Sequence, residues 1–329
     1  MSAGGKAQDE FAMSLTFFRR SSTEQVSGGT RRGRPRIGVA LGAGVARGWA
    51  HIGALRELIE MGVTPDVVVG ASIGAVVGGC FAAGRLDALE DFARGLTKRS
   101  VFNLIDVSFR GGGLMGGDKL RARLESAMGQ QRIENLPTRF VAVATEMRTG
   151  HEVWLKNGLV VDAMRASYAL PGIFEPVRIG GRWLFDGAII NPVPVNVARA
   201  FGADWVLALS IVGDIPNGAI IHESAEEDEP APAPEPPAGK LWWLRRGAAQ
   251  APGAPGVAQV MVDTFNITQD RIMRSRLAGD PPDQMITMKA KSIGLFEFHR
   301  AAELIELGRA AVRKAKPELM EQLSGVLAD

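Results

Sequence analysis

Ser72 lies between two glycines, in the segment Gly70-Ala71-Ser72-Ile73-Gly74. An apolar run precedes this segment and a helix-forming stretch follows it. The G-x-S-x-G pattern is typical of a nucleophile elbow, a sharp strand-to-helix turn that presents a serine hydroxyl to substrate. The flanking glycines allow strand and helix to approach closely, and a helix N-terminus favours negative charge that develops beside it. The pattern therefore predicts Ser72 as a nucleophile, although so short a motif needs support from the rest of the chain.

A glycine-rich loop, Gly42-Ala43-Gly44-Val45-Ala46-Arg47-Gly48, follows the first apolar run. A dinucleotide site would need G-x-G-x-x-G and an acidic residue at the end of the next strand. The spacing here is G-x-G-x-x-x-G, and the nearest acid, Asp66, precedes that strand. We therefore favour an oxyanion hole in which the N–H groups of Gly44 and Val45 face the serine. Two roles stay open for Arg47, which could bind an anionic head group or brace the loop.

A nucleophilic serine needs a base, and the segment Phe185-Asp186-Gly187-Ala188 offers one. Asp186 ends a predicted strand and could take the serine proton directly from about 2.6–3.2 Å. Because an aspartate is a weak base at its ordinary pKa of about 3.9, the oxyanion hole and a dry site would carry much of the catalysis. Alternatively, Asp186 could only accept hydrogen bonds from the turn. A further alternative base is His299, which follows Asp186 in the order of an α/β-hydrolase triad. The other histidines have less suitable contexts; they are His51, His151 and His222.

These segments together resemble the patatin-like phospholipases, in particular the bacterial RssA type of the neuropathy-target-esterase branch. The resemblance runs from about Arg36 to Ile211 and weakly to the C-terminus, and the stretches Arg165–Val177 and Asp186–Pro194 strengthen it. It implies a three-layer α/β/α hydrolase with a mostly parallel central sheet. It also implies a Ser–Asp dyad, without a catalytic histidine or a cofactor, that hydrolyses acyl esters of phospholipids or lysophospholipids.

Residue by residue, the resemblance implies Ser72 as nucleophile and Asp186 as general base. The amides of Ala43, Gly44 and Val45 would form the oxyanion hole. The supporting motif positions would be Gly42, Arg47, Gly48, Gly70, Gly74 and Gly187. Related enzymes often have four glycines where this chain has Gly42-Ala43-Gly44-Val45, so the N–H donors are retained while the required φ angles are in question. A weakly active or inactive membrane-associated adaptor with the same fold is the alternative.

Alternating apolar runs and helical patterns predict a mostly parallel sheet covered on both faces. The predicted strands are 36–41, 67–69, 140–145, 151–155, 177–179, 182–185, 205–211 and 285–289. The predicted helices follow the glycine loop up to Gly62 and the elbow up to Ala83, and then occupy 87–96, 162–169, 257–277 and 298–314. We expect Arg110–Gly117 to be a mobile loop and Asp118 to cap the next helix.

Composition divides the chain into four parts. Residues 1–34 carry an excess of arginine and predict a disordered basic arm, and residues 35–212 contain the catalytic motifs. Residues 213–256 are acidic and proline-rich and predict a flexible insertion. Residues 257–329 are expected to complete the same domain with helices and a strand. Within the insertion, Trp242 and Trp243 stand beside basic residues and could contact a membrane interface.

Net charge, cysteine and histidine content and apolar run length exclude several classes of protein. The net charge of +2 gives no indication of a nucleic-acid partner, and the single cysteine excludes an internal disulfide and fits a reducing compartment. The scattered histidines predict no metal site. No run of about 18 apolar residues or secretory leader is visible. We therefore expect a cytoplasmic protein, with contact to the inner face of the membrane as a further option.

Overall fold

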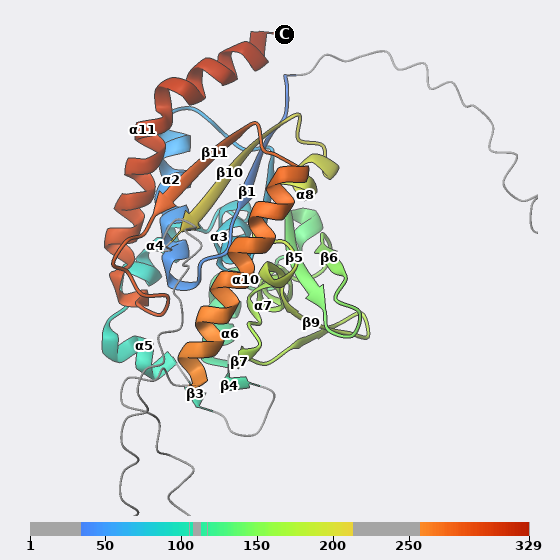
Figure 1. Ribbon diagram of the computed structural model, residues 1–329, viewed down its shortest axis with the longest axis vertical. Coiled ribbons are helices and arrows are strands. Elements are labelled where there is room, and N and C mark those ends of the chain that lie inside the picture. The colour runs from blue at the N-terminus through green and yellow to red at the C-terminus, as the bar shows by residue number, and fades with distance from the viewer. Residues whose placement is uncertain (1–33, 105, 108–112, 117, 213–256, 329) are drawn as a thin grey trace, which may run out of the picture. The chain divides into compact units, whose positions relative to one another are not determined.

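A single large β-sheet runs through the computed structural model, which describes residues 34–104, 106–107, 113–116, 118–212 and 257–328 (Figure 1). The sheet order is β11-β10-β1-β2-β5-β9-β8, and β6 also pairs with β5. The parallel strands are β1 (Ile37–Leu41), β2 (Val67–Ala71), β5 (Arg139–Glu146), β10 (Trp205–Val212) and β11 (Gln284–Lys289). The antiparallel strands are β6 (Glu152–Leu155), β8 (Val177–Ile179) and β9 (Arg182–Asp186).

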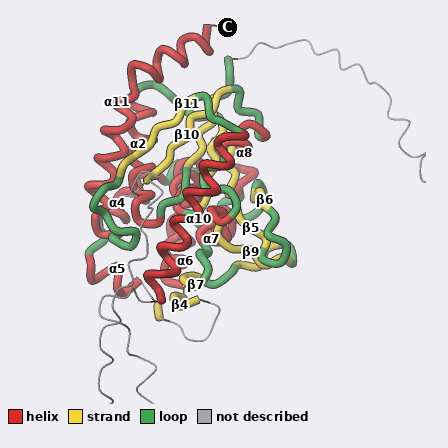
Figure 2. Tube along the Cα trace, in the orientation of Figure 1, coloured by secondary structure: helices red, strands yellow, loops and turns green. Residues whose placement is uncertain are grey.

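Helices cover both faces of this sheet (Figure 2). They are α2 (Ala50–Glu60), α3 (Ile73–Ala82), α4 (Leu86–Arg94), α5 (Lys98–Leu104), α6 (Asp118–Met128), α7 (Val160–Tyr168), α8 (Val195–Ala200), α10 (Val257–Gly279) and α11 (Ala301–Ala328). Short 3-10 helices are η1 (Val45–Trp49), η2 (Ile133–Asn135), η3 (Gly187–Ile189) and η4 (Phe298–Arg300). A small second sheet joins β3 (Asp106–Val107), β4 (Gly113–Gly116) and β7 (Gly172–Phe174).

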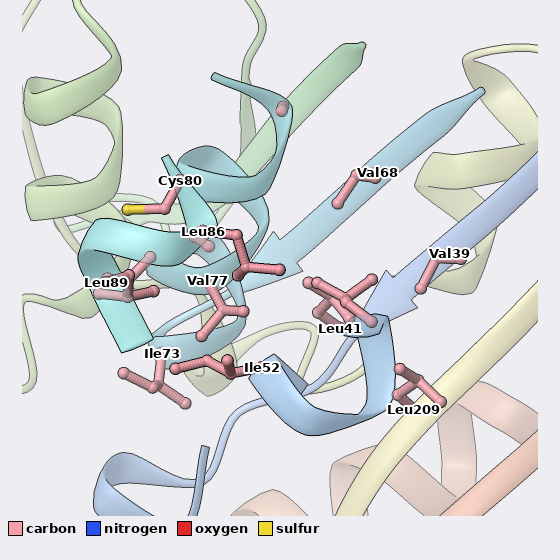
Figure 3. Packing of buried hydrophobic residues seen from close by; sticks show 14 of the residues in the cluster. Val39, Leu41, Ile52, Val68, Ile73, Val77, Cys80, Leu86, Leu89 and Leu209 are labelled. Carbon is pink, nitrogen blue, oxygen red and sulfur yellow. The ribbon is translucent and has the colours of Figure 1, made fainter. Parts of the chain in front are cut away.

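The period-2 alternation of strand side chains creates the layers. Val39 and Leu41 of β1 face one cluster with α2, α3 and α11, whereas Ala40 faces a second cluster with α8 and α10. Figure 3 shows side chains of this cluster from three elements, Leu41 of β1, Val68 of β2 and Ile52 of α2. Because both faces of the parallel strands are buried, these strands read as continuous apolar runs in the sequence. The predicted three-layer α/β/α fold with a mostly parallel sheet is confirmed.

Some of the predicted helices and strands differ from those in the structure. Gly113–Gly116, expected to belong to a mobile loop, form strand β4, because they pair with β3 and β7. The predicted C-terminal helix is longer than expected, since α11 continues past Pro317 to Ala328. Asp118 is the first residue of α6. Several short elements had no expected counterpart, namely α5, α8, β3, β7 and η2.

Several expectations concern residues that the structure does not describe. They are the basic arm up to residue 33, the rest of the predicted loop at 108–112 and 117, and the insertion at 213–256 with His222, Trp242 and Trp243.

Candidate active site

The strand register brings Ser72 and Asp186 together. Val143 of β5 pairs with Ala71 of β2 on one side and with Trp154 of β6 on the other. The next residue, Ala144, pairs with Asp186 of β9 and again with β6. Strands β2 and β9 therefore occupy the same edge of β5, one running parallel to it and the other antiparallel. Their carboxyl ends meet, and the residues at those ends are the predicted nucleophile and the predicted base.

The elbow has the strained backbone that its sequence predicts. Ser72 sits between β2 and α3 with φ of 56° and ψ of −126°, a region that a residue with a side chain occupies only at a cost of roughly 1–3 kcal/mol. The Ser72 N–H donates to Ser167 Oγ at 3.0 Å, and Ser167 Oγ donates in turn to the Val143 carbonyl at 2.6 Å. These two hydrogen bonds link the elbow to α7 and β5 and hold it in its strained conformation.

The glycines of the motifs are required by close packing. A Cβ on Gly74 would overlap the Leu41 carbonyl, and a Cβ on Gly187 would overlap the Val143 carbonyl. A Cβ on Gly48 would overlap the Ile73 side chain, and a Cβ on Gly70 would overlap the Gly74 backbone. The glycines therefore let α3 and η3 lie directly against the ends of the strands.

The Ser72 hydroxyl donates a hydrogen bond to Asp186 Oδ2 at 2.7 Å. The other carboxylate oxygen, Oδ1, accepts from the Ala188 N–H at 2.8 Å, which fixes the orientation of the carboxylate. Thr145 Oγ1 donates to the Asp186 carbonyl at 2.9 Å and secures the backbone. Ser72 and Asp186 are 7% and 1% exposed, so the pair is nearly dry.

Burial raises the pKa of Asp186 from 3.8 to about 7, and the hydrogen bonds from Ala188 and Ser72 only partly oppose this rise. The cause is desolvation, which disfavours the charged carboxylate. A carboxylate with a pKa near neutrality is a much better proton acceptor than an ordinary aspartate. The burial of Asp186 thus removes the weakness that its ordinary pKa would impose on it as a base.

The glycine loop lies beside the elbow, but its amides differ in availability. The Gly42 N–H donates to the Leu209 carbonyl at 2.9 Å and the Ala43 N–H to the Pro192 carbonyl at 3.0 Å. This engagement argues against Ala43 as an oxyanion donor. Within the described residues, the Gly44 and Val45 amides donate to no backbone carbonyl outside their own 3-10 turn.

Val45 adopts a positive φ of 51° even though it is β-branched. Such a conformation is a genuine outlier for this residue type. The chain therefore keeps a glycine-like backbone at a position where it has no glycine. Val45 also lines the cavity that contains Ser72 and Asp186, so its strained peptide borders the site.

Arg47 braces the loop. Its Nε donates to the Ile293 carbonyl at 2.7 Å, and the neighbouring Ala46 N–H donates to the Leu295 carbonyl at 3.0 Å. Both bonds reach the segment between β11 and α11, so the C-terminal part of the chain holds the loop in place. Of the two roles open for Arg47, this geometry favours the bracing role.

No described histidine forms a hydrogen bond with Ser72 or Asp186. His51 is fully buried, and its Nε2 lies 2.7 Å from the Gly42 carbonyl, to which it donates. Burial lowers the pKa of His51 to about 4, so the ring is neutral and supports the loop. His299 lies in η4 and His151 is exposed after β5.

An apolar cavity of ≈ 120 Å³ opens beside Ser72 and Asp186. Its walls come from η1, α3, α4, α5, α6, α7, β7 and the segment before α11. The apolar lining residues include Val76, Phe92, Leu96, Val101, Leu120, Leu170, Ile173, Phe174, Phe296 and Phe298. Two edge-to-face aromatic pairs border it, Trp49 with Phe298 and Tyr168 with Phe174. The cavity suits a hydrocarbon chain rather than a polar substrate.

The sequence did not predict a role in the site for Ser167 or for the residues that line the cavity. Ser167 is a buried hydroxyl on the otherwise apolar inner side of α7, and a polar residue in such a place would have been the available indication. The cavity walls carry no comparable pattern, since their apolar residues look like any other core residues. No group of three or more His, Cys, Asp or Glu side chains among the described residues could hold a metal ion.

Known proteins are similar to this chain in sequence and in fold. Residues 39–199 match the family described as Patatin-like phospholipase. An uncharacterized NTE family protein of Mycobacterium tuberculosis is 34% identical over 333 residues, which cover 85% of this chain and 91% of that relative. The chain belongs to the patatin-like phospholipase family.

Two further similarities agree with this assignment. A second uncharacterized NTE family protein of Mycobacterium tuberculosis is 29% identical over 293 residues, covering 86% of this chain but 47% of the relative. The crystal structure of VipD from Legionella pneumophila superimposes with a TM-score of 0.52 at 14% identity, covering 85% of this chain and 66% of VipD. The VipD similarity shows a shared fold. Membership of this family supports a lipid hydrolase. None of the described helices is long and apolar enough to cross a membrane.

Proposed function

We propose that this protein hydrolyses carboxylic esters of lipids by two-step acyl transfer, with Ser72 as nucleophile and Asp186 as general base. The 2.7 Å hydrogen bond from Ser72 Oγ to Asp186 Oδ2 is the observation that carries the proposal. Ser72 Oγ attacks the ester carbonyl while its proton moves to Asp186. The ester C–O bond then breaks, and Asp186 returns the proton to the departing alkoxide. Water, deprotonated by Asp186, finally attacks the acyl-enzyme. The bond between the acyl group and Ser72 Oγ breaks, Asp186 returns the proton to Ser72 Oγ, and the fatty acid leaves.

The negative charge on the former carbonyl oxygen needs donors that are already in place. The amides of Gly44 and Val45 are our candidates, because Ala43 is engaged with Pro192. The N-terminus of α3, which begins directly after Ser72, adds a favourable electrostatic potential. The hydrogen bonds from Arg47 and Ala46 to the segment before α11 would keep the loop from yielding as charge develops.

The apolar cavity beside Ser72 supports an acyl chain as the substrate group. Its volume of ≈ 120 Å³ approaches that of an apolar cavity of about 150 Å³ that holds benzene. The enclosed part therefore accommodates several methylenes next to the carbonyl, and a longer chain would extend beyond it. Phospholipids and lysophospholipids are the substrate class that we propose.

A panel of lysophospholipids, phospholipids and a p-nitrophenyl acyl ester tests this proposal. Wild-type protein should release fatty acid or nitrophenol, and Ser72→Ala should lose this activity. A fluorophosphonate probe should label wild-type protein and leave Ser72→Ala unlabelled. Full esterase activity in Ser72→Ala would refute the nucleophile. An unlabelled, inactive wild-type protein would instead favour the adaptor alternative.

His299→Ala is the matched control for the competing triad. Because Ser72 donates to Asp186 and not to a histidine, we expect this variant to keep its activity. A loss comparable to that of Ser72→Ala would favour a Ser–His–Asp mechanism.

A further inference from the structure

An exposed apolar pair lies where the turn after β5 meets strand β9. Met147 and Trp183 are 56% and 50% exposed. The Met147 N–H donates to the Trp183 carbonyl at 2.9 Å, so the two residues are neighbours on the surface. Large apolar side chains exposed side by side mark interaction sites more often than isolated ones do.

Arginines surround this pair. The Arg178 guanidinium lies 6.0 Å from the centre of the Trp183 ring, its cross-strand partner in the β8–β9 hairpin. Arg148 is exposed in the turn directly after Met147. Arg178 forms no ion pair with an acidic side chain in the described part of the chain. An arginine stacked on an aromatic ring keeps its N–H groups available for phosphate. We call Met147, Arg148, Arg178 and Trp183 the hairpin patch.

The hairpin patch lies at the same end of the sheet as the nucleophile. Strand β5 runs parallel to β2, and Ser72 follows the β2 residue that pairs with Val143. Strand β5 continues from Val143 to Glu146, about 10 Å at the usual rise per residue, and Met147 follows in the turn. Strand β9 carries Trp183 and ends at Asp186. Figure 1 shows β9, β7 and β4 together at the lower end of the molecule.

We propose that the hairpin patch docks the protein on an anionic lipid surface. Tryptophan is favoured at a membrane–water interface because its ring is amphipathic. Arginines near the surface are attracted by the negative potential of acidic lipids. The patch combines both features. One exposed acidic residue, Glu175, lies in the segment that leads into the β8–β9 hairpin. Docking through this patch would bring the carboxyl end of the sheet, and with it Ser72, toward the lipid. That consequence for catalysis rests on the proposed function, whereas the docking itself does not.

Vesicle co-sedimentation of the full chain tests the docking. Vesicles of phosphatidylcholine with phosphatidylglycerol should bind wild-type protein more tightly than vesicles of phosphatidylcholine alone, and added salt should weaken the binding. Arg148→Gln combined with Arg178→Gln should weaken binding to the anionic vesicles about 25-fold, from about fivefold for each arginine. Trp183→Ala should weaken it by about tenfold through lost apolar burial.

Trp154→Ala provides the matched control. Trp154 is also exposed, at 39%, but it lies on β6 opposite Val143 and packs edge-to-face on Phe201. It therefore stands on the other edge of β5, away from Met147. Its replacement should leave vesicle binding unchanged. An equal effect of Trp154→Ala and Trp183→Ala would overturn the assignment of the patch.

Hydrolysis of a water-soluble p-nitrophenyl ester separates docking from chemistry. The patch variants should keep this activity while they lose vesicle binding and hydrolysis of vesicle lipids. Wild-type-like vesicle binding by both Trp183→Ala and the double arginine variant would overturn the proposal. A change of oligomeric state in these variants without a change in vesicle binding would also overturn it, in favour of self-association. An inactive wild-type protein that still binds vesicles through the patch would refute the proposed function and retain the docking.

Discussion

Two regions of the molecule differ in backbone strain and in the burial of charge. One is the junction of β2, β5 and β9, and the other is the interface between α2 and α11. At the junction, Ser72 and Val45 have positive φ angles and Asp186 is buried with a raised pKa. Each of these features costs folding free energy. At the α2–α11 interface both segments are regular α-helices. The first region carries strain at the proposed site, whereas the second consists of regular, closely packed helices.

The α2–α11 interface depends on two small residues and on ion pairs that join Glu57 and Glu60 to Arg309 and Arg313. A Cβ on Gly53 would overlap the Ile305 carbonyl, and a Cβ on Gly308 would overlap the Ala50 carbonyl, so the helices are in backbone contact. The Glu57 side chain is 8% exposed and accepts from Arg313 at 2.8 Å. Because α11 follows the segment that holds the glycine loop, this tight packing also anchors one wall of the site.

The largest effect is expected for Asp186→Asn, which removes the base and keeps the shape. Asn can still accept from Ala188, so we expect a loss of esterase activity on the order of 10³-fold or more. The same variant should gain about 1–4 kcal/mol in the free energy of unfolding above pH 7, because a costly buried charge disappears. Activity assays and urea unfolding at pH 8 measure the two effects. Loss of activity together with loss of stability would contradict a site that is strained for function.

The second prediction concerns Gly308→Ala, which should reduce the free energy of unfolding by about 1–3 kcal/mol, and by more if the helices cannot separate. Thermal or urea unfolding measures this change. Gly325→Ala is the matched control on the same helix, because a Cβ there meets no neighbouring atom. Similar effects of the two replacements would show that α2 and α11 are not in close contact.

The pH dependence of activity should follow Asp186. The base is active when deprotonated, so kcat/KM should rise about tenfold per pH unit below about pH 7 and level off above it. Stability should respond in the opposite sense. The folded protein holds the Asp186 proton up to about pH 7, whereas the unfolded chain releases it near pH 3.8, so this residue's contribution to stability falls as the pH rises through that window. A pH profile that levels off below pH 5 would contradict the raised pKa.

The smallest effects are expected for Ser167→Ala and Glu57→Gln. Ser167→Ala removes the acceptor of the Ser72 N–H and should lower kcat by about tenfold, since one hydrogen bond of about 1–1.5 kcal/mol holds the elbow. Glu57→Gln should leave kcat unchanged and cost about 1 kcal/mol of stability, because Arg313 is largely exposed and water replaces its partner. A kcat loss in Glu57→Gln as large as in Ser167→Ala would show that the two regions are not separable.

The sequence alone determined the local parts of this protein. The elbow around Ser72, the glycine loop and the strand ending at Asp186 were predicted because each needs a particular backbone conformation, which restricts the residues that can stand there. The strands of the parallel sheet were also predicted from local sequence, because burial on both faces makes each of them a continuous apolar run.

Only the tertiary structure decided how these parts meet. The shared edge of β5 fixes the contact of Ser72 with Asp186, although 113 residues separate them in the chain. The tertiary structure also determines that the Ala43 amide donates to the Pro192 carbonyl and that Arg47 donates to the Ile293 carbonyl. In the same way, it places Gly113–Gly116 in a strand. The cavity walls and the hairpin patch come from distant segments in the same way. The physical reason is that register and packing depend on partners far along the chain, which local residue preferences do not specify.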